Sequence, residues 1–327
     1  MKLYRFTLTP QSAFGTPLVG DSLFGQLCWA IANRFGQDRL TELLKGYTEQ
    51  KPFMVVSDAF PKGYLPLPTL PSKFWEKPNS DNRKALKKLQ WIQLAEIRKP
   101  VKEWQKGAFE LQKQFDKYNE DNKTSKDFVK KEILAKASQD QYHNTINRQT
   151  GTTGEGVFAP YATDVTWYAK DQAFDLYVVL DEQRFSTDEL KQVLQDVGQF
   201  GFGRDASIGL GKFNVELEQT VEFGEKNANC YLTLANCAPQ NLGLDKARCF
   251  YQITTRFGRH GDVQALGSNP FKKPIILAKT AAIFTPNQYE VRSFLGNGLS
   301  NVSHAQPNAV HQGYAPVMPL SVEFPNE

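Results

Sequence analysis

The chain has 327 residues, 40% of them hydrophobic, and a formal net charge of +4 at pH 7. This length is enough for two domains with apolar cores, and the small net charge excludes a protein that binds nucleic acid as a uniform polycation. The four cysteines form no C-x-x-C pair and have no histidine partners at zinc-finger spacing, so we expect no metal and no cofactor. The sequence lacks the apolar runs of a signal peptide or a membrane span, which predicts a cytoplasmic protein without a membrane partner.

Hydrophobic periodicity in the first part of the chain predicts a strand, a helix and a strand and, after a long interval, the same order again. The strands are expected at 2–9, 53–60, 174–181 and 212–218, and the helices at 21–35 and 186–197. Asp21 or Ser22 is expected to cap the first helix, and a capping box of Ser186 and Glu189 opens the second. This βαββαβ order is typical of a ferredoxin-like domain, in which both helices cover one face of the sheet and leave the other free for a ligand.

The predicted fold class is α+β, with two ferredoxin-like (RRM-like) modules. The first, residues 1–224, carries an insertion at about 62–168, which begins with several prolines and continues with a Lys-rich stretch of helical pattern. We therefore expect a long helical insertion. The second, residues 225–327, contains no convincing amphipathic helix and is expected to be a degenerate unit. Its strands are expected at 230–237, 249–257, 274–284 and 315–324.

A glycine-rich loop links the last helix of the first module to its last strand. The stretch Gly198–Phe213, GQFGFGRDASIGLGKF, contains five glycines together with Arg204, Ser207 and Lys212. Glycine adopts backbone angles that a Cβ forbids and allows a ligand to approach the backbone closely, so the loop is a candidate cradle for an extended anion. Its spacing fits neither a Walker loop nor a dinucleotide fingerprint. A surface loop without a ligand is the alternative interpretation.

Several further segments occur in a consistent order along nearly the whole chain. They are Phe14-Gly15, DSLFGQLCW at 21–29, SDAFP at 57–61, HNTINR at 143–148, RFG at 256–258, NPFKKP at 269–274 and GYAP at 313–316. Together with the glycine loop, they resemble the RAMP superfamily, the RNA-binding proteins of CRISPR systems, and within it the type III-A Csm-complex subunit that caps the crRNA 5′ tag. The chain departs from that pattern at 279–282, KTAA, where relatives tend to have a Gly-Ser step.

The resemblance implies a non-catalytic subunit that binds the 5′ tag of crRNA and joins the large polymerase-like subunit to the backbone RAMP subunit. Main-chain N–H groups of the loop would hold phosphates, and bases would stack on Phe14 or Phe202. The candidate RNA-binding residues form three groups. They are Phe14, Gly15, Gly201, Phe202, Gly203, Arg204, Ser207, Gly209, Gly211 and Lys212 around the glycine loop, then His143, Asn144 and Arg148, and finally Arg256, Arg259, Lys272 and Lys273.

Three other functions remain open from the sequence. A metal-independent nuclease of the same superfamily that processes repeat RNA would use His143 with Arg148 for acid–base chemistry. A target-cleaving backbone subunit would use an aspartate, for which Asp21 is the candidate. A protein-only scaffold would use its basic surfaces, including the Lys-rich insertion, to bind acidic partners. The fate of RNA distinguishes these functions, because the tag-binding subunit keeps it intact, either nuclease cuts it, and the scaffold does not bind it.

Overall fold

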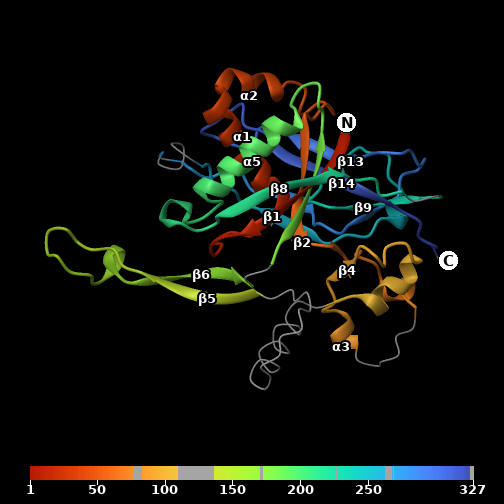
Figure 1. The fold of residues 1–327 in the computed structure, drawn as a ribbon, viewed down its shortest axis with the longest axis horizontal. Coiled ribbons are helices and arrows are strands. Elements are labelled where there is room, and N and C mark those ends of the chain that lie inside the picture. Colours follow the sequence, from red (N-terminus) through yellow and green to blue (C-terminus); the bar gives the residue numbers. More distant parts are fainter. Residues whose placement is uncertain are drawn as a thin grey trace.

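The computed structural model describes residues 1–76, 83–109, 136–169, 172–224, 227–261, 267 and 269–324 (Figure 1). A four-stranded sheet in the order β2-β7-β1-β8 organises the N-terminal half, and every neighbouring pair is antiparallel. Its strands are β1 (Lys2–Pro10), β2 (Met54–Pro61), β7 (Phe174–Leu180) and β8 (Phe213–Thr220). All four strands were predicted, β1 and β8 from alternating apolar side chains.

Three helices lie together on one face of this sheet (Figure 1). They are α1 (Gly20–Phe35), α2 (Gln37–Leu43) and α5 (Thr187–Phe200). The predicted capping box is confirmed, because Ser186 and Glu189 exchange side-chain and main-chain hydrogen bonds. The predicted cap of α1 is wrong, since neither Asp21 nor Ser22 caps it. Instead, the N–H group of Gly20 donates to Asp58 Oδ1 on β2 at 2.8 Å.

The opposite face of the sheet is covered at β2 and β7 rather than free. Tyr177 on β7 and Phe60 on β2 are buried and share one apolar cluster with Leu232 and Met318 of the C-terminal half and with Trp104 of the insertion. The expectation of an open sheet face for a ligand is therefore wrong. On β8 the same face remains exposed at Asn214 and Glu216.

The C-terminal half contains a second four-stranded sheet, in the order β12-β9-β14-β13, and a separate two-stranded sheet. The strands of the larger sheet are β9 (Cys230–Thr233), β12 (Ile283–Phe284), β13 (Phe294–Leu299) and β14 (His311–Leu320). The smaller sheet pairs β10 (Ile253–Arg256) with β11 (Ile275–Ala278). Within the described residues of this half no α-helix occurs. The sequence did not predict β13, because its sequence FLGNGL resembles a turn.

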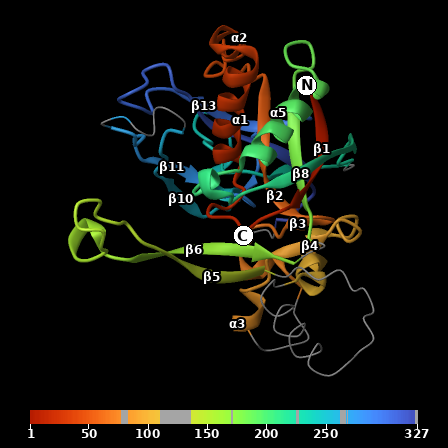
Figure 2. The ribbon, with the colours of Figure 1, turned by 60° about the vertical axis from the view of Figure 1, so that its left-hand side comes forward.

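The insertion is assembled from short elements. Their bounds are β3 (Tyr64–Pro66), α3 (Arg83–Leu86), β4 (Trp91–Gln93), β5 (Lys136–His143) and β6 (Tyr161–Tyr168), with a 3-10 helix at Val101–Gly107. The prediction of a long helical insertion is wrong for the described residues, in which α3 spans only four residues. Residues 110–135, on which part of that prediction rested, lie outside the described residues. The β5–β6 hairpin projects from the body as an arm (Figures 1 and 2).

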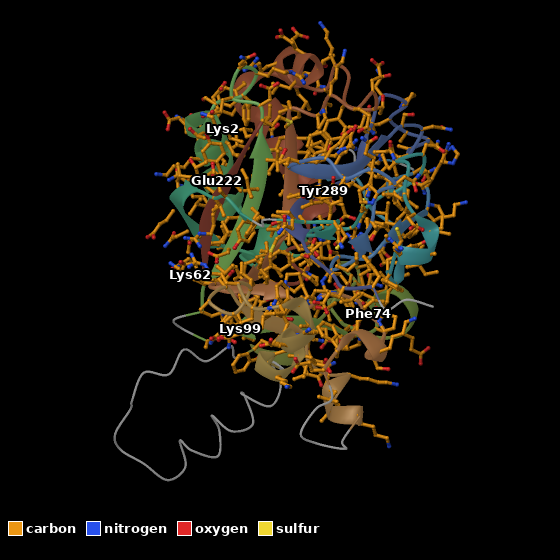
Figure 3. The ribbon with its side chains drawn as sticks, turned by 90° about the vertical axis from the view of Figure 1, so that its right-hand side faces the viewer. Lys2, Lys62, Phe74, Lys99, Glu222 and Tyr289 are labelled. Carbon is orange, nitrogen blue, oxygen red and sulfur yellow. The ribbon has the colours of Figure 1, made fainter. Side chains whose placement is uncertain are left out.

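The two halves are joined by buried polar contacts as well as by apolar packing. The side chain of Gln312 on β14 accepts from the N–H group of Val56 at 2.8 Å and donates to the carbonyl oxygen of the same residue at 2.7 Å. The N–H group of Asp58 donates to the carbonyl oxygen of Leu234 at 2.8 Å. Figure 3 shows the dense side-chain packing that continues from the sheets into the insertion, marked there by Phe74 and Lys99. None of the helices in the described part of the chain combines the length and the apolar composition needed to cross a bilayer.

Candidate nucleic-acid interface

The glycine loop, Gly198–Phe213, is held in place by the segment that follows β1. The N–H group of Gly211 donates to the carbonyl oxygen of Ala13 at 2.7 Å, and that of Lys212 donates to Ser12 Oγ at 2.9 Å. The N–H group of Arg204 donates to Thr16 Oγ1 at 2.9 Å. The protein itself therefore uses several of the main-chain donors that the sequence assigned to phosphates.

The glycines of this loop serve close packing of the chain. A Cβ on Gly211, whose φ is +73°, would lie 2.1 Å from the carbonyl oxygen of Phe202. A Cβ on Gly203, with a φ of +78°, would lie 2.5 Å from the Cβ of Thr16, and one on Gly15 would lie 2.8 Å from the carbonyl oxygen of Arg204. Gly201 also has a positive φ. Gly209 differs from these residues, because at its φ of +102° a Cβ would meet nothing within 4 Å.

The predicted stacking of bases on Phe14 and Phe202 is wrong. The two residues are only 2% and 1% exposed, and both rings belong to the main apolar core. Of the candidate residues, the loop presents the side chains of Arg204, Ser207 and Lys212 to solvent, and Phe200 and Ile208 are exposed beside them. The surface of this loop therefore offers two cations, a hydroxyl group and apolar side chains.

A groove of about 600 Å³ runs beside the loop between α1 and α5. Ser207 lines one side of it, Trp29 on α1 lines another, and Phe200 at the end of α5 contributes a ring that is 78% exposed. The wall of the groove thus combines aromatic surface with hydroxyl and amide groups.

The β5–β6 arm begins next to the glycine loop. Phe14 and Thr166 on β6 exchange two main-chain hydrogen bonds of 2.9 Å, and the guanidinium of Arg204 donates to the carbonyl oxygen of Asp164. Along the arm, the His143 ring stacks on Tyr161 with 5.2 Å between ring centroids, and its Nε2 lies 3.0 Å from Thr163 Oγ1. The first group of predicted residues therefore adjoins the base of the arm that carries the second.

The remaining residues of the second group, Asn144 and Arg148, lie beyond the paired strands and are exposed. The arm also presents aromatic side chains to solvent, with Tyr142 78% exposed and Trp167 47% exposed. This combination of an exposed arginine with exposed rings suits contact with a polynucleotide.

Arg256 in the third group has a structural partner. Its Nε lies 2.6 Å from Asp21 Oδ2, and its second guanidinium nitrogen donates to Asp21 Oδ1 at 2.8 Å and to Ser22 Oγ at 2.7 Å. Burial alone would raise the pKa of Asp21, but His311 and Arg256 together lower it to about 2. The Asp21 side chain is 1% exposed, so its carboxylate serves this ion pair and is not presented to a substrate.

A second buried carboxylate, that of Asp58, stands close to this ion pair. Its Oδ2 accepts from Thr280 Oγ1 at 2.5 Å, while its Oδ1 accepts from the N–H group of Gly20. Burial raises the pKa of Asp58 to about 6, against these two hydrogen bonds, which lower it. The network therefore fixes the start of α1 against the C-terminal half.

The other three cations of the third group differ in their surroundings. Arg259 is exposed and lies over the ring of Phe271, 6.0 Å from its centroid. Lys273 donates to Asn301 Oδ1 at 2.6 Å. Lys272 is half-buried beside α1, and burial lowers its pKa.

The exposed side of α1 connects the glycine loop with the third group. A Cβ on Gly261 would lie 3.4 Å from the indole of Trp29, which also lines the groove that contains Ser207. His143 and Arg148 lie instead on the arm. The sequence reasoning missed Thr16 and Trp29, although Trp29 stands within a segment that carries the family resemblance and Thr16 directly follows another.

A family model described as the RAMP superfamily matches residues 6–214. The chain belongs to the RAMP superfamily. Among solved structures, a chain of the "Csm1-Csm4 cassette in complex with pppApA" is similar to this RAMP protein, with a TM-score of 0.59 and 15% sequence identity over 99% of this chain and 100% of that chain. A chain of the "Csm3-Csm4 subcomplex in the type III-A CRISPR-Cas interference complex" gives a TM-score of 0.58 and 14% identity, and the match covers 98% of this chain and 100% of that chain. No curated protein matches in sequence.

Proposed function

We propose that this RAMP protein is a non-catalytic crRNA-binding subunit of a type III-A CRISPR interference complex. In this role it holds the repeat-derived 5′ tag of the crRNA and joins the large polymerase-like subunit to the backbone RAMP subunit. The observation that carries the proposal is the full-length likeness of its fold to chains from both a Csm1-Csm4 and a Csm3-Csm4 assembly. A protein that bridges two such partners has to contact both, and that likeness extends across both halves of the chain.

The same comparison supports an interpretation of the architecture as two ferredoxin-like modules, 1–224 and 225–327. The sheet order β2-β7-β1-β8 favours this interpretation for the first module, because α1 and α2 connect β1 to β2 and α5 connects β7 to β8. The second module would be degenerate, in that its described residues form a four-stranded sheet without the two helices.

RNA would lie along the surface between the glycine loop and the third group. Arg204 and Lys212 would contact phosphates and position the strand, because such contacts carry no sequence information themselves. The arm, with His143, Asn144 and Arg148, would contact RNA or a neighbouring subunit. The buried, ion-paired state of Asp21 argues against its use in RNA cleavage. His143 stacks on Tyr161, whose phenol is a possible acid–base group, so the fate of bound RNA distinguishes the tag-binding subunit from a processing nuclease.

A binding experiment with two RNAs tests this function. One is a labelled single-stranded RNA that carries the repeat-derived 5′ segment, and the other has that segment scrambled. We expect tighter binding of the first, and co-purification of both partner subunits with the protein. Equal affinity for the two RNAs would contradict tag recognition, and failure to retain either partner would contradict the bridging role.

An arginine pair of similar exposure supplies the control for charge. The side chains of Arg204 and Arg292 are 41% and 44% exposed. Arg204→Ala should weaken RNA binding and make the log–log salt dependence shallower by about 0.7, the contribution of one phosphate contact to a single strand. Arg292→Ala should leave both quantities unchanged. An equal effect of the two substitutions would mean that only the overall charge matters.

A further inference from the structure

Two exposed phenylalanines stack on one another beside the two-stranded β10–β11 sheet. Phe257 directly follows β10 and Phe271 lies shortly before β11. Their ring centroids are 5.4 Å apart and the ring planes are inclined by only 9°, while the residues are 63% and 47% exposed. Neither ring belongs to an apolar core cluster. The fold therefore keeps two parallel aromatic rings in contact with solvent.

The segments that carry these rings are fixed to each other. The N–H group of Lys272 donates to the carbonyl oxygen of Gly258 at 2.8 Å, and that of His260 donates to the carbonyl oxygen of Pro270 at 2.7 Å. On the side of β10, Arg256 is bound to the buried carboxylate of Asp21. The ring pair is thus preorganised, and a ligand that binds it has little backbone freedom to remove.

The two segments that carry the rings bear only positive charges. The segments 256–261 and 269–274 contain four cationic side chains and no carboxylate. Arg256 is bound to Asp21, and the guanidinium of Arg259 lies over the ring of Phe271. Flat π-surfaces next to cations suit unpaired bases and their phosphates, because every base has a face that stacks and every phosphate is anionic.

We propose that Phe257 and Phe271 form a stacking platform for an unpaired base of single-stranded RNA, with Arg259 and Lys273 beside it for the flanking phosphates. The proposal rests on the RNA-binding function proposed above and adds to it the place at which a base is held. The base would stack on the solvent-facing side of Phe257 and extend the series formed by Phe257, Phe271 and Arg259.

The platform lies at one end of a surface that reaches the glycine loop. From the platform, the segment of Gly258 to Gly261 leads to the indole of Trp29, against which Gly261 packs. Trp29 lines the groove that contains Ser207. An RNA strand held at both the platform and the glycine loop would therefore cross the exposed side of α1.

Fluorescence of a base analogue tests stacking directly. The full chain would be titrated into single-stranded repeat-derived RNAs that carry 2-aminopurine at one position each. We expect quenching at one position, and about tenfold weaker binding by the double variant Phe257→Ala/Phe271→Ala, together with loss of that quenching. Phe257→Trp should retain both signals, whereas Phe257→Leu, which keeps an apolar side chain without a π-face, should lose the quenching.

Ile276 supplies the matched control, because it lies on the neighbouring strand β11 and is 63% exposed, like Phe257. Ile276→Ala should bind and quench as the unmodified protein does. If the double variant binds RNA and quenches as strongly as the unmodified protein, the platform is overturned while the RNA-binding function stands. If it instead loses a partner subunit and keeps its RNA affinity, the rings form a protein contact and the proposal fails. If the unmodified protein binds none of these RNAs at low salt, both proposals fail.

Discussion

The glycine loop and the Phe257–Phe271 platform are both rich in glycine and cations, but the fold uses them in opposite ways. In the glycine loop, the glycines permit close packing, and main-chain donors bind the segment after β1. In the platform, the backbone holds two large rings in solvent. A conspicuous sequence motif can thus serve the packing of the chain itself. Exposed side chains that do not contribute to the core mark a binding surface more clearly.

Substitution of the loop glycines is the most severe test of this comparison. Gly211→Ala places a Cβ 2.1 Å from a carbonyl oxygen at a φ of +73°, so we expect the free energy of unfolding to fall by about 3–5 kcal/mol, from strain and overpacking together. Gly209→Ala has open space and should cost only about 1–2 kcal/mol from its positive φ. Urea unfolding of both variants checks the difference. If the two variants lose the same free energy of unfolding, close packing at Gly211 does not contribute to the stability of the loop.

The two arginines three positions apart give the next test. Arg256→Ala leaves the buried carboxylate of Asp21 without its main partner and should lower the free energy of unfolding by about 3 kcal/mol. Arg259→Ala removes an exposed side chain and should change stability by less than about 0.5 kcal/mol while weakening RNA binding. Thermal unfolding and RNA titration of both variants separate the two roles. If Arg256→Ala is stable but binds RNA weakly, Arg256 contacts RNA and does not serve mainly to stabilise the fold.

Asp58 predicts a pH dependence of stability. Its pKa is raised from 3.8 to about 6, so the protonated form favours folding. The stability it contributes is complete below about pH 4 and is lost as the pH rises through about 6, up to roughly 3 kcal/mol in all. We expect Asp58→Asn to remove this decline. Urea unfolding from pH 4 to pH 7 would show parallel curves for the two proteins if Asp58 were not responsible.

Much of the first module could be predicted from the sequence, because β1 and β8 alternate clearly, β2 and β7 are short apolar runs, and the Ser186–Glu189 box is a local signal. Contacts between distant segments could not be predicted. Asp21 and Ser22 match a helix cap, yet Asp58 accepts the first N–H group of α1, and Asp21 pairs with Arg256, more than two hundred positions away. In β13, Gly296 lies so close to β14 that a Cβ would stand 2.1 Å from the carbonyl oxygen of Gly313. Gly296, one of the glycines that made this strand resemble a turn, is needed for that approach.

The candidate site was predicted in part. The glycine-rich sequence correctly predicted that Arg204, Ser207 and Lys212 lie at the surface. It did not indicate that Phe14 and Phe202 are buried. Phe14 and Phe202 were predicted to stack on RNA bases because they are aromatic and stand beside glycines. Their burial depends instead on packing against β8 and the helices. Phe257 and Phe271 stood within recognised motifs and were not assigned, because their stacking joins segments separated in sequence.

The departure from the family pattern at 279–282 gives the smallest expected effect. Ala281 has a φ of +73°, a backbone conformation that a Cβ disfavours. Ala281→Gly should relieve this strain and, after the greater flexibility of the unfolded chain is subtracted, raise the free energy of unfolding by about 0.5–1 kcal/mol. Gly substitution of the neighbouring Ala282, whose φ is not positive, should destabilise the protein. Thermal unfolding of the two variants decides between these signs.

The fate of bound RNA tests the central claim most directly. The purified protein would be incubated in EDTA with end-labelled repeat-derived RNA across a salt series, and each sample divided between a native and a denaturing gel. We predict a shifted but intact RNA, with binding that falls by a log–log slope of about −0.7 for each phosphate contact. RNA that is cut, and that stays whole with His143→Ala, would contradict the account and identify a processing nuclease.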